Sequence, residues 1–107
     1  MNARHTHALI RARFPVFVAS AHAWELLAHG DSNDTARVHA FLHAHFTHDT
    51  LVVHVSRKLG GLMTIDTATK LITSVIGQAE IRLASPDFTE LAVIGHPGVA
   101  TAWRQAV

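Results

Sequence analysis

Histidine is the residue whose number and placement in this chain suggest chemistry. The chain has ten histidines, and only His96 lies beyond residue 54. The other nine are His5, His7, His22, His29, His39, His43, His45, His48 and His54. Imidazole binds divalent cations and gains a proton near neutral pH. Metal binding and pH-dependent charge are therefore the two chemistries to consider for the N-terminal half.

One group of metal-ligating residues falls on an expected helix over residues 16–29. His22, Glu25 and His29 stand at i, i+3 and i+7, which places their side chains on the polar side of that helix. The spacing is compatible with a divalent-cation site. A solvated helix surface is the alternative interpretation, because the polar side of any amphipathic helix carries such residues.

A second group belongs to an expected helix over residues 35–46. His39 and His43 are four residues apart, so both imidazoles are able to reach one ion, and His48 or Asp49 after the helix would complete the site. Zinc, nickel and copper are the expected metals. Ala40 stands where the His-Glu-x-x-His pattern needs its general base, which excludes a hydrolytic metalloprotease of that type.

The remaining N-terminal histidines are not expected to be ligands. His45 lies within the apolar arc of its helix and is predicted to be a neutral core residue, and His54 lies in the middle of a strand and is predicted to be buried. His5 and His7 are expected to belong to a loose N-terminus.

No recognisable catalytic motif accompanies the histidines. The chain has no cysteine, no Gly-x-Ser-x-Gly nucleophile motif, no phosphate-binding glycine loop and no recognisable pair of acidic residues. Its net charge of +1 is too small for a nucleic-acid surface, and no run of about 18 apolar residues is available to span a membrane. A non-catalytic cytoplasmic protein without a cofactor, apart from a metal ion, is expected.

Hydrophobic periodicity predicts the elements that must position these residues. Alternation over 8–14 predicts a strand, and helical periodicity predicts helices over 16–29, 35–46 and about 68–76. Further strands are expected at 50–56, 79–84, 91–95 and 99–103. Residues 62–65 are ambiguous, since they are also able to extend a hairpin at Gly60 and Gly61.

These elements predict one small α/β (α+β) domain over residues 1–107. Its mixed sheet of four or five strands is packed by three helices and ends in a C-terminal hairpin. The order strand, helix, strand over residues 50–84 predicts a parallel crossover. Arg57 and Lys58, after the central strand, are expected to protect a sheet edge.

Protein contacts are the expected function of such a domain. Trp103 and Arg104, near the end of the last strand, are candidate interface residues, because tryptophan and arginine are enriched at binding hot spots. A core position is the alternative for Trp103. The C-terminal hairpin is a possible homodimer contact. Divalent-metal binding through the histidines is the alternative function, and a pH-responsive surface is a third.

Overall fold

A computed structural model of the 107-residue chain describes residues 2–14, 24–27, 35–95 and 98–105. The elements of this part are α1 (Ala3–Arg13), β1 (Glu25–Leu26), α2 (Thr35–His45), β2 (Thr50–Ser56), β3 (Leu59–Thr64), α3 (Ile65–Val75), β4 (Ile81–Ala84), β5 (Glu90–Ile94) and β6 (Val99–Arg104). The expected α+β class with three helices and a C-terminal hairpin, β5–β6, is confirmed. None of the described helices is long and apolar enough to cross a membrane.

The strands form one sheet in the order β1-β6-β5-β4-β2-β3, with more strands than expected. Every neighbouring pair is antiparallel. The prediction of a mixed sheet with a parallel crossover is therefore wrong. The cause is β3, which reverses the chain between β2 and α3, so that β4 returns beside β2 in the opposite direction.

The β2–β3 hairpin depends on Gly60. A Cβ atom at this position would lie 2.5 Å from the carbonyl oxygen of Val53 and 3.3 Å from the Cα atom of His54. The register also shifts by one residue between His54 and Ser56, opposite this glycine. Only glycine allows the two backbones to approach so closely, and the ambiguous residues before Ile65 accordingly form a strand.

The N-terminal segment is a helix, and the prediction of a strand over 8–14 is wrong. Asn2 caps α1, because its side-chain oxygen accepts a hydrogen bond from the His5 N–H at 2.8 Å. The helix ends before Phe14, whose extended backbone is typical of a residue that precedes proline. The apparent alternation came from alanines and arginines, which are compatible with either structure.

The helix expected over 16–29 is wrong at Glu25–Leu26, which form strand β1 beside β6. The Leu27 N–H extends this pairing by donating to the Gly98 carbonyl at 2.9 Å. Residues 16–23 and 28–29 of the expected helix lie outside the described part of the chain.

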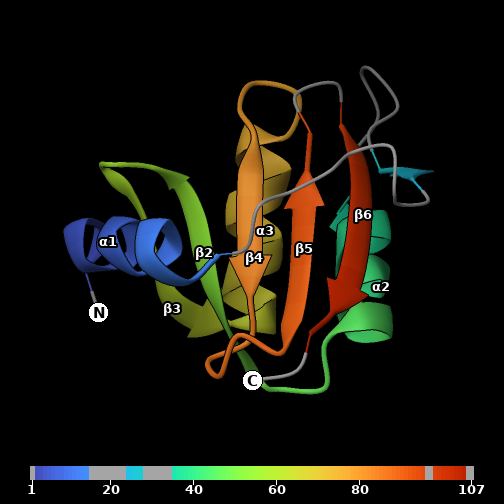
Figure 1. Ribbon diagram of the computed structural model, residues 1–107. Coiled ribbons are helices and arrows are strands. Elements are labelled where there is room, and N and C mark those ends of the chain that lie inside the picture. Colours follow the sequence, from blue (N-terminus) through green and yellow to red (C-terminus); the bar gives the residue numbers. More distant parts are fainter. Residues whose placement is uncertain (1, 15–23, 28–34, 96–97, 106–107) are drawn as a thin grey trace.

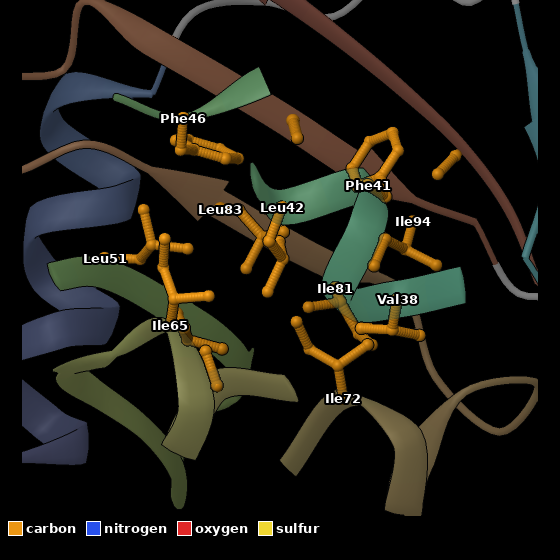
Figure 2. Close-up of a cluster of buried hydrophobic side chains, with 14 of the residues drawn as sticks. Val38, Phe41, Leu42, Phe46, Leu51, Ile65, Ile72, Ile81, Leu83 and Ile94 are labelled. Atoms are coloured by element: carbon orange, nitrogen blue, oxygen red, sulfur yellow. The ribbon is translucent and has the colours of Figure 1, made fainter. Parts of the chain in front are cut away.

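Helix α1 lies on one face of the sheet and α2 and α3 lie on the other (Figure 1). A hydrophobic cluster fills the space on each face. The larger cluster joins α2 and α3 to the sheet and contains Val38, Leu42, Ile72 and Leu83, among others (Figure 2). The smaller one lies under α1 and comprises Ile10, Val52, Ala84, Phe88 and Leu91, with Leu9, Phe14 and Trp103 packed against it. Burial of these apolar surfaces is the main stabilising contribution to the fold.

Candidate functional site

A groove runs between α2 and the edge of the sheet formed by β1 and β6. It consists of three adjoining cavities of about 360, 220 and 200 Å³, and His45 lines all three. The lining residues are Trp24, Glu25, Leu26, Leu27, Arg37, Ala40, Phe41, Ala44, His45, Ala100, Thr101, Ala102, Trp103 and Arg104. Polar and apolar groups contribute about equally to the lining, and the cavity next to Arg104 is the most polar of the three.

Small side chains on both walls create the space. Ala40 and Ala44 are one helical turn apart on α2, and Ala100 and Ala102 stand two residues apart on β6. Phe41 is buried at the base of the groove and stacks at a tilt on His45, with ring centroids 4.6 Å apart. A larger residue at any of these alanines would reduce the free space.

His45 is exposed, so its prediction as a core residue is wrong. On α2, His45 lies at the edge of the apolar side of the helix. At this position its side chain lines the groove and is not covered by the sheet. Arg37, in the first turn of the same helix, donates a hydrogen bond to the Leu26 carbonyl at 3.4 Å and connects α2 to β1.

The groove borders a partly open strand edge. β1 pairs with β6 only at Val99 and Ala100. The Gln105 N–H donates to Thr89 and the Gly95 N–H donates to Val99, so odd-numbered residues of β6 direct their backbone groups towards β5. Ala102 and Arg104 therefore direct theirs outward, where no strand lies in the described part of the chain.

The large exposed apolar side chains in the described ranges all belong to the two outer strands or the residue next to one. They are Trp24 and Leu26 at β1, and Leu59 and Leu62 in β3. Between 38 and 48% of their surface is accessible. Exposed apolar surface at a sheet edge is typical of a contact site.

His39 and His43 do lie side by side on α2, as their spacing predicts. Their Nε2 atoms are 3.2 Å apart, and His39 Nε2 is also 3.2 Å from the Asp66 Oδ1 atom at the start of α3. All three side chains are accessible to solvent. Sequence reasoning missed Asp66, because only the packing of α3 against α2 brings it there.

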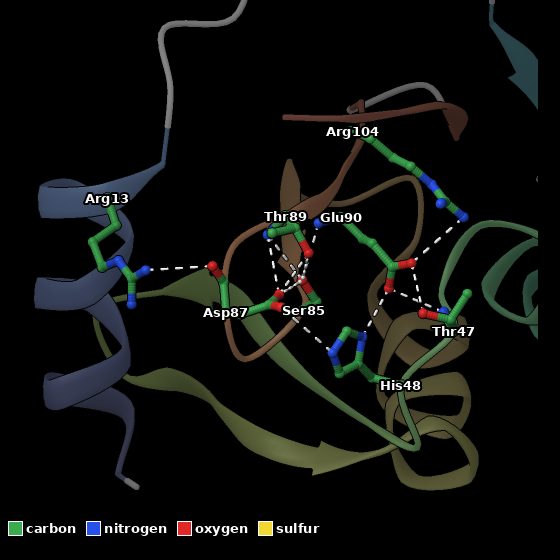
Figure 3. A network of polar contacts seen from close by, with 8 residues as sticks. All are labelled: Arg13, Thr47, His48, Ser85, Asp87, Thr89, Glu90 and Arg104. Carbon is green, nitrogen blue, oxygen red and sulfur yellow. Dashed lines mark hydrogen bonds and ion pairs between the residues drawn. The ribbon is translucent and has the colours of Figure 1, made fainter. Parts of the chain in front are cut away.

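His48 does not join this pair as expected. Its Nδ1 atom is 2.9 Å from Glu90 Oε1, and its Nε2 atom is 3.7 Å from Asp87 Oδ2 (Figure 3). Asp49, the other suggested ligand, accepts a backbone hydrogen bond from Ile65. In the ranges that the structure describes, no three histidine, aspartate or glutamate side chains are placed to hold a metal ion.

Glu90 is the most buried acidic residue of this polar network, with 5% of its side chain accessible. Burial raises the pKa of Glu90, but hydrogen bonds from the Thr47 N–H, the Thr47 hydroxyl and His48 outweigh it, so that the pKa is lowered overall. Arg104 lies 3.5 Å from the same carboxylate. The carboxylate thus ties the end of α2 to β5.

Asp87 organises the loop between β4 and β5. Hydrogen bonds from the hydroxyl groups of Ser85 and Thr89 hold the pKa of this carboxyl far below its usual value. Ser85 donates to Asp87, while both ring nitrogens of His48 face carboxylates, so no base is placed to activate the serine. This network fixes two connections of the fold and does not resemble a catalytic centre.

Two further histidines of the N-terminal half, His7 and His54, contact each other, while His5 is exposed on α1. His7 Nδ1 lies 2.8 Å from His54 Nε2, which connects α1 to β2. His54 is half-buried, and burial followed by the charges of His7 and Arg82 lowers its pKa. The prediction of a loose N-terminus is wrong, because helix α1 lies on the sheet at this point, and His54, which was predicted to be buried, is only half-buried.

The remaining candidate residues are placed as follows. His22 and His29 lie outside the described residues, while Glu25 is in β1 and lines the groove. Trp103 is half-buried and packs edge-on against Phe14, with ring centroids 5.9 Å apart. Arg104 is exposed, and the structure does not test its expected role in an interface.

Comparison with known proteins gives no match: no protein-family model, curated protein or solved structure matches this chain.

Proposed function

We propose that this protein is a non-catalytic binding domain, and that the groove between α2 and the β1–β6 edge receives a short segment of a protein partner. The observation that carries the proposal is the coincidence of three features in one place. They are an open groove with an apolar base, the exposed side chain of Leu26, and the outward backbone groups of Ala102 and Arg104.

These features fit an extended peptide better than a compact small molecule. Backbone groups at a strand edge pair with an added strand, while alternate side chains of that strand enter an adjoining groove. The alanine-lined walls accommodate an apolar side chain. Arg37 and Arg104, both exposed, outnumber the one lining carboxylate, Glu25, and so favour acidic residues beside it.

Selection from a random peptide library on the immobilised full chain tests the proposal. We expect enrichment of peptides that combine an apolar residue with neighbouring acidic residues. Ala44→Arg fills the groove and should weaken binding of the enriched peptides at least tenfold by fluorescence anisotropy. Ala36→Arg is the matched control, since Ala36 is an exposed residue of α2 that does not line the groove.

Two results would refute this function. One is the absence of any enriched peptide, and the other is equal binding of the enriched peptides to the Ala44→Arg and Ala36→Arg variants. Circular dichroism of both variants establishes that they remain folded.

We propose metal binding as a second candidate function, with His39 and His43 as ligands. The supporting observation is the crowding around His39 Nε2, which lies 3.2 Å from both His43 Nε2 and Asp66 Oδ1. This nitrogen offers either one hydrogen or one lone pair, so it cannot form a separate hydrogen bond with each neighbour. A divalent cation would interact favourably with both imidazole nitrogens, and the Asp66 carboxylate would be a negatively charged neighbour of the ion.

Calorimetric titration of the untagged chain with zinc, nickel and copper tests this candidate. We expect binding by the wild type, its loss in His39→Ala and in His43→Ala, and weaker binding in Asp66→Asn. His45→Ala is the control, because His45 lies on the same helix but contacts Phe41. Absence of heat with the wild type, or equal loss in the control, would eliminate metal binding at this pair.

A further inference from the structure

The second outer strand of the sheet, β3, has an unusually unprotected edge. Among the described strands its only hydrogen-bonded neighbour is β2, while α1 packs on one face of β3 near Gly60. Its sequence, Leu-Gly-Gly-Leu-Met-Thr, contains no charge and no proline, although sheet edges of monomeric proteins are usually protected by such residues. Leu59 is 38% exposed and Leu62 is 44% exposed. This edge is suited to pairing with another strand.

The backbone of β3 determines which groups are offered at this edge. The Ile65 N–H donates to the Asp49 carbonyl at 3.1 Å, and Ile65 continues the register in which Met63 pairs with Leu51 and Gly61 with Val53. In an antiparallel pair, hydrogen-bonded positions alternate along the strand. Odd-numbered residues of β3 therefore bond to β2, and Gly60, Leu62 and Thr64 direct their N–H and C=O groups outward.

We propose that β3 of a second copy of this chain pairs antiparallel with this edge, about a two-fold axis at Leu62. In this register Leu62 lies opposite the partner's Leu62, and Gly60 lies opposite the partner's Thr64. All of these residues present their backbone groups outward, so each of the three pairs forms two hydrogen bonds, about six in all. The two six-stranded sheets become one continuous sheet.

The charges beside β3 agree with the antiparallel direction. Lys58 lies in the turn before β3 and Asp66 in the first turn of α3 after it, so antiparallel pairing brings the Lys58 end of each strand to the Asp66 end of the partner's strand. Both residues are exposed, and the Asp66 side chain is 84% accessible. These opposite charges at the two ends of β3 favour antiparallel pairing over parallel pairing, which would bring like charges together.

The side chains at the centre of the interface are also compatible with a second copy. Leu62 pairs in register with Val52, whose side chain lies in the cluster under α1, so the two Leu62 side chains meet on the α1 face of the sheet. The two-fold axis is perpendicular to the sheet, and the two α1 helices therefore lie on the same face, one on each side of the Leu62 pair. This contact uses the opposite edge from the proposed peptide groove and does not depend on it (Figure 1).

Sedimentation of the full chain over a range of concentrations tests the proposal. We expect the wild type to approach twice the chain mass of 11.6 kDa. Leu62→Lys places two like charges against each other at the two-fold axis and should weaken the dimer at least tenfold. Leu26→Lys, at an exposed leucine on the opposite edge of the sheet, should leave the dimer intact.

Two further sets of variants test the direction and the centre of the pairing. Lys58→Asp and Asp66→Lys should each weaken the dimer, and the double variant should restore it. Since the chain has no cysteine, Leu62→Cys introduces a single thiol, which should form a disulfide-linked dimer under mild oxidation, whereas Leu26→Cys should remain monomeric on a non-reducing gel. A wild type that stays monomeric at all concentrations, or a Leu62→Lys variant as dimeric as the wild type, overturns the proposal.

Discussion

At the scale of single residues, the histidines of this chain differ because their neighbours differ. His48 contacts a buried carboxylate, His7 and His54 contact each other, and His39 contacts both Asp66 and His43. The same residue type, histidine, thus takes part in a structural network, in a contact between a helix and a strand, and in a candidate cation site. The network around Glu90 permits the most direct prediction at this scale.

Replacement of Glu90 by glutamine should lower the free energy of unfolding by about 1–3 kcal/mol. Glutamine keeps the shape but loses the charge that accepts hydrogen bonds from Thr47 and His48, and its amide group directs hydrogens at these donors. Urea unfolding at neutral pH measures the change. Glu80→Gln is the control, because Glu80 makes only an exposed ion pair with Arg82 and should cost less than about 0.5 kcal/mol.

The pH dependence gives the Glu90 prediction a second readout. Because folding lowers the pKa of Glu90, its contribution to stability is complete above the ordinary value of 4.5 and is lost as the pH falls through the folded-state pKa. The difference between the wild type and Glu90→Gln should accordingly diminish in acid. Equal stability of the Glu90→Gln and Glu80→Gln variants at neutral pH would show that the network contributes nothing.

At the scale of elements, the contact between α1 and β2 depends on a pair of imidazoles. The 2.8 Å contact between His7 and His54 needs a donor on one ring and an acceptor on the other. Two protonated rings offer only donors, and Arg82 adds positive charge beside His54. The attachment of α1 should therefore weaken in acid.

We expect the wild-type free energy of unfolding to decrease between pH 8 and pH 5.5, in part because of His54. Folding lowers the pKa of His54 below its usual 6.5, so the unfolded chain binds more protons in the window just below 6.5. Stability is thus highest above this window and falls as the pH falls into it. His54→Gln should reduce the decrease, whereas His45→Gln, an exposed control on α2, should retain it. An identical decrease in all three proteins contradicts the prediction.

At the scale of the whole molecule, the two faces of the sheet are stabilised unequally. In the described residues, the cluster under α2 and α3 is much larger than the one under α1, which has Ile10 as its one buried aliphatic side chain from that helix. Loss of α1 from the sheet would leave the larger cluster intact. Local unfolding of α1 should therefore require less free energy than unfolding of α2 and α3.

Leu42→Ala should destabilise the whole fold by about 2–5 kcal/mol, whereas Ile10→Ala should mainly release α1. Both side chains are fully buried, so the two variants are matched in burial and differ in the cluster that they disturb. Hydrogen exchange distinguishes them. Ile10→Ala should lose amide protection in α1 while α2 and α3 keep theirs, and Leu42→Ala should lower protection throughout. A uniform loss in both variants would contradict this division.

Local sequence patterns determined α2, β2, α3 and the β5–β6 hairpin. The residues of each have a hydrophobic period or turn residues that act over a few positions, and the proximity of His39 to His43 follows from one turn of a helix. These features therefore needed no knowledge of distant contacts.

Tertiary structure alone decided the antiparallel order of the sheet, the helical state of α1 and the positions of most polar partners. β2 lies between β3 and β4, His7 reaches His54 across 47 residues, and Glu90 reaches His48 across 42. The groove beside His45 likewise exists only where α2 packs against the β1–β6 edge. Such contacts depend on which surfaces the fold brings together, and no local period encodes them.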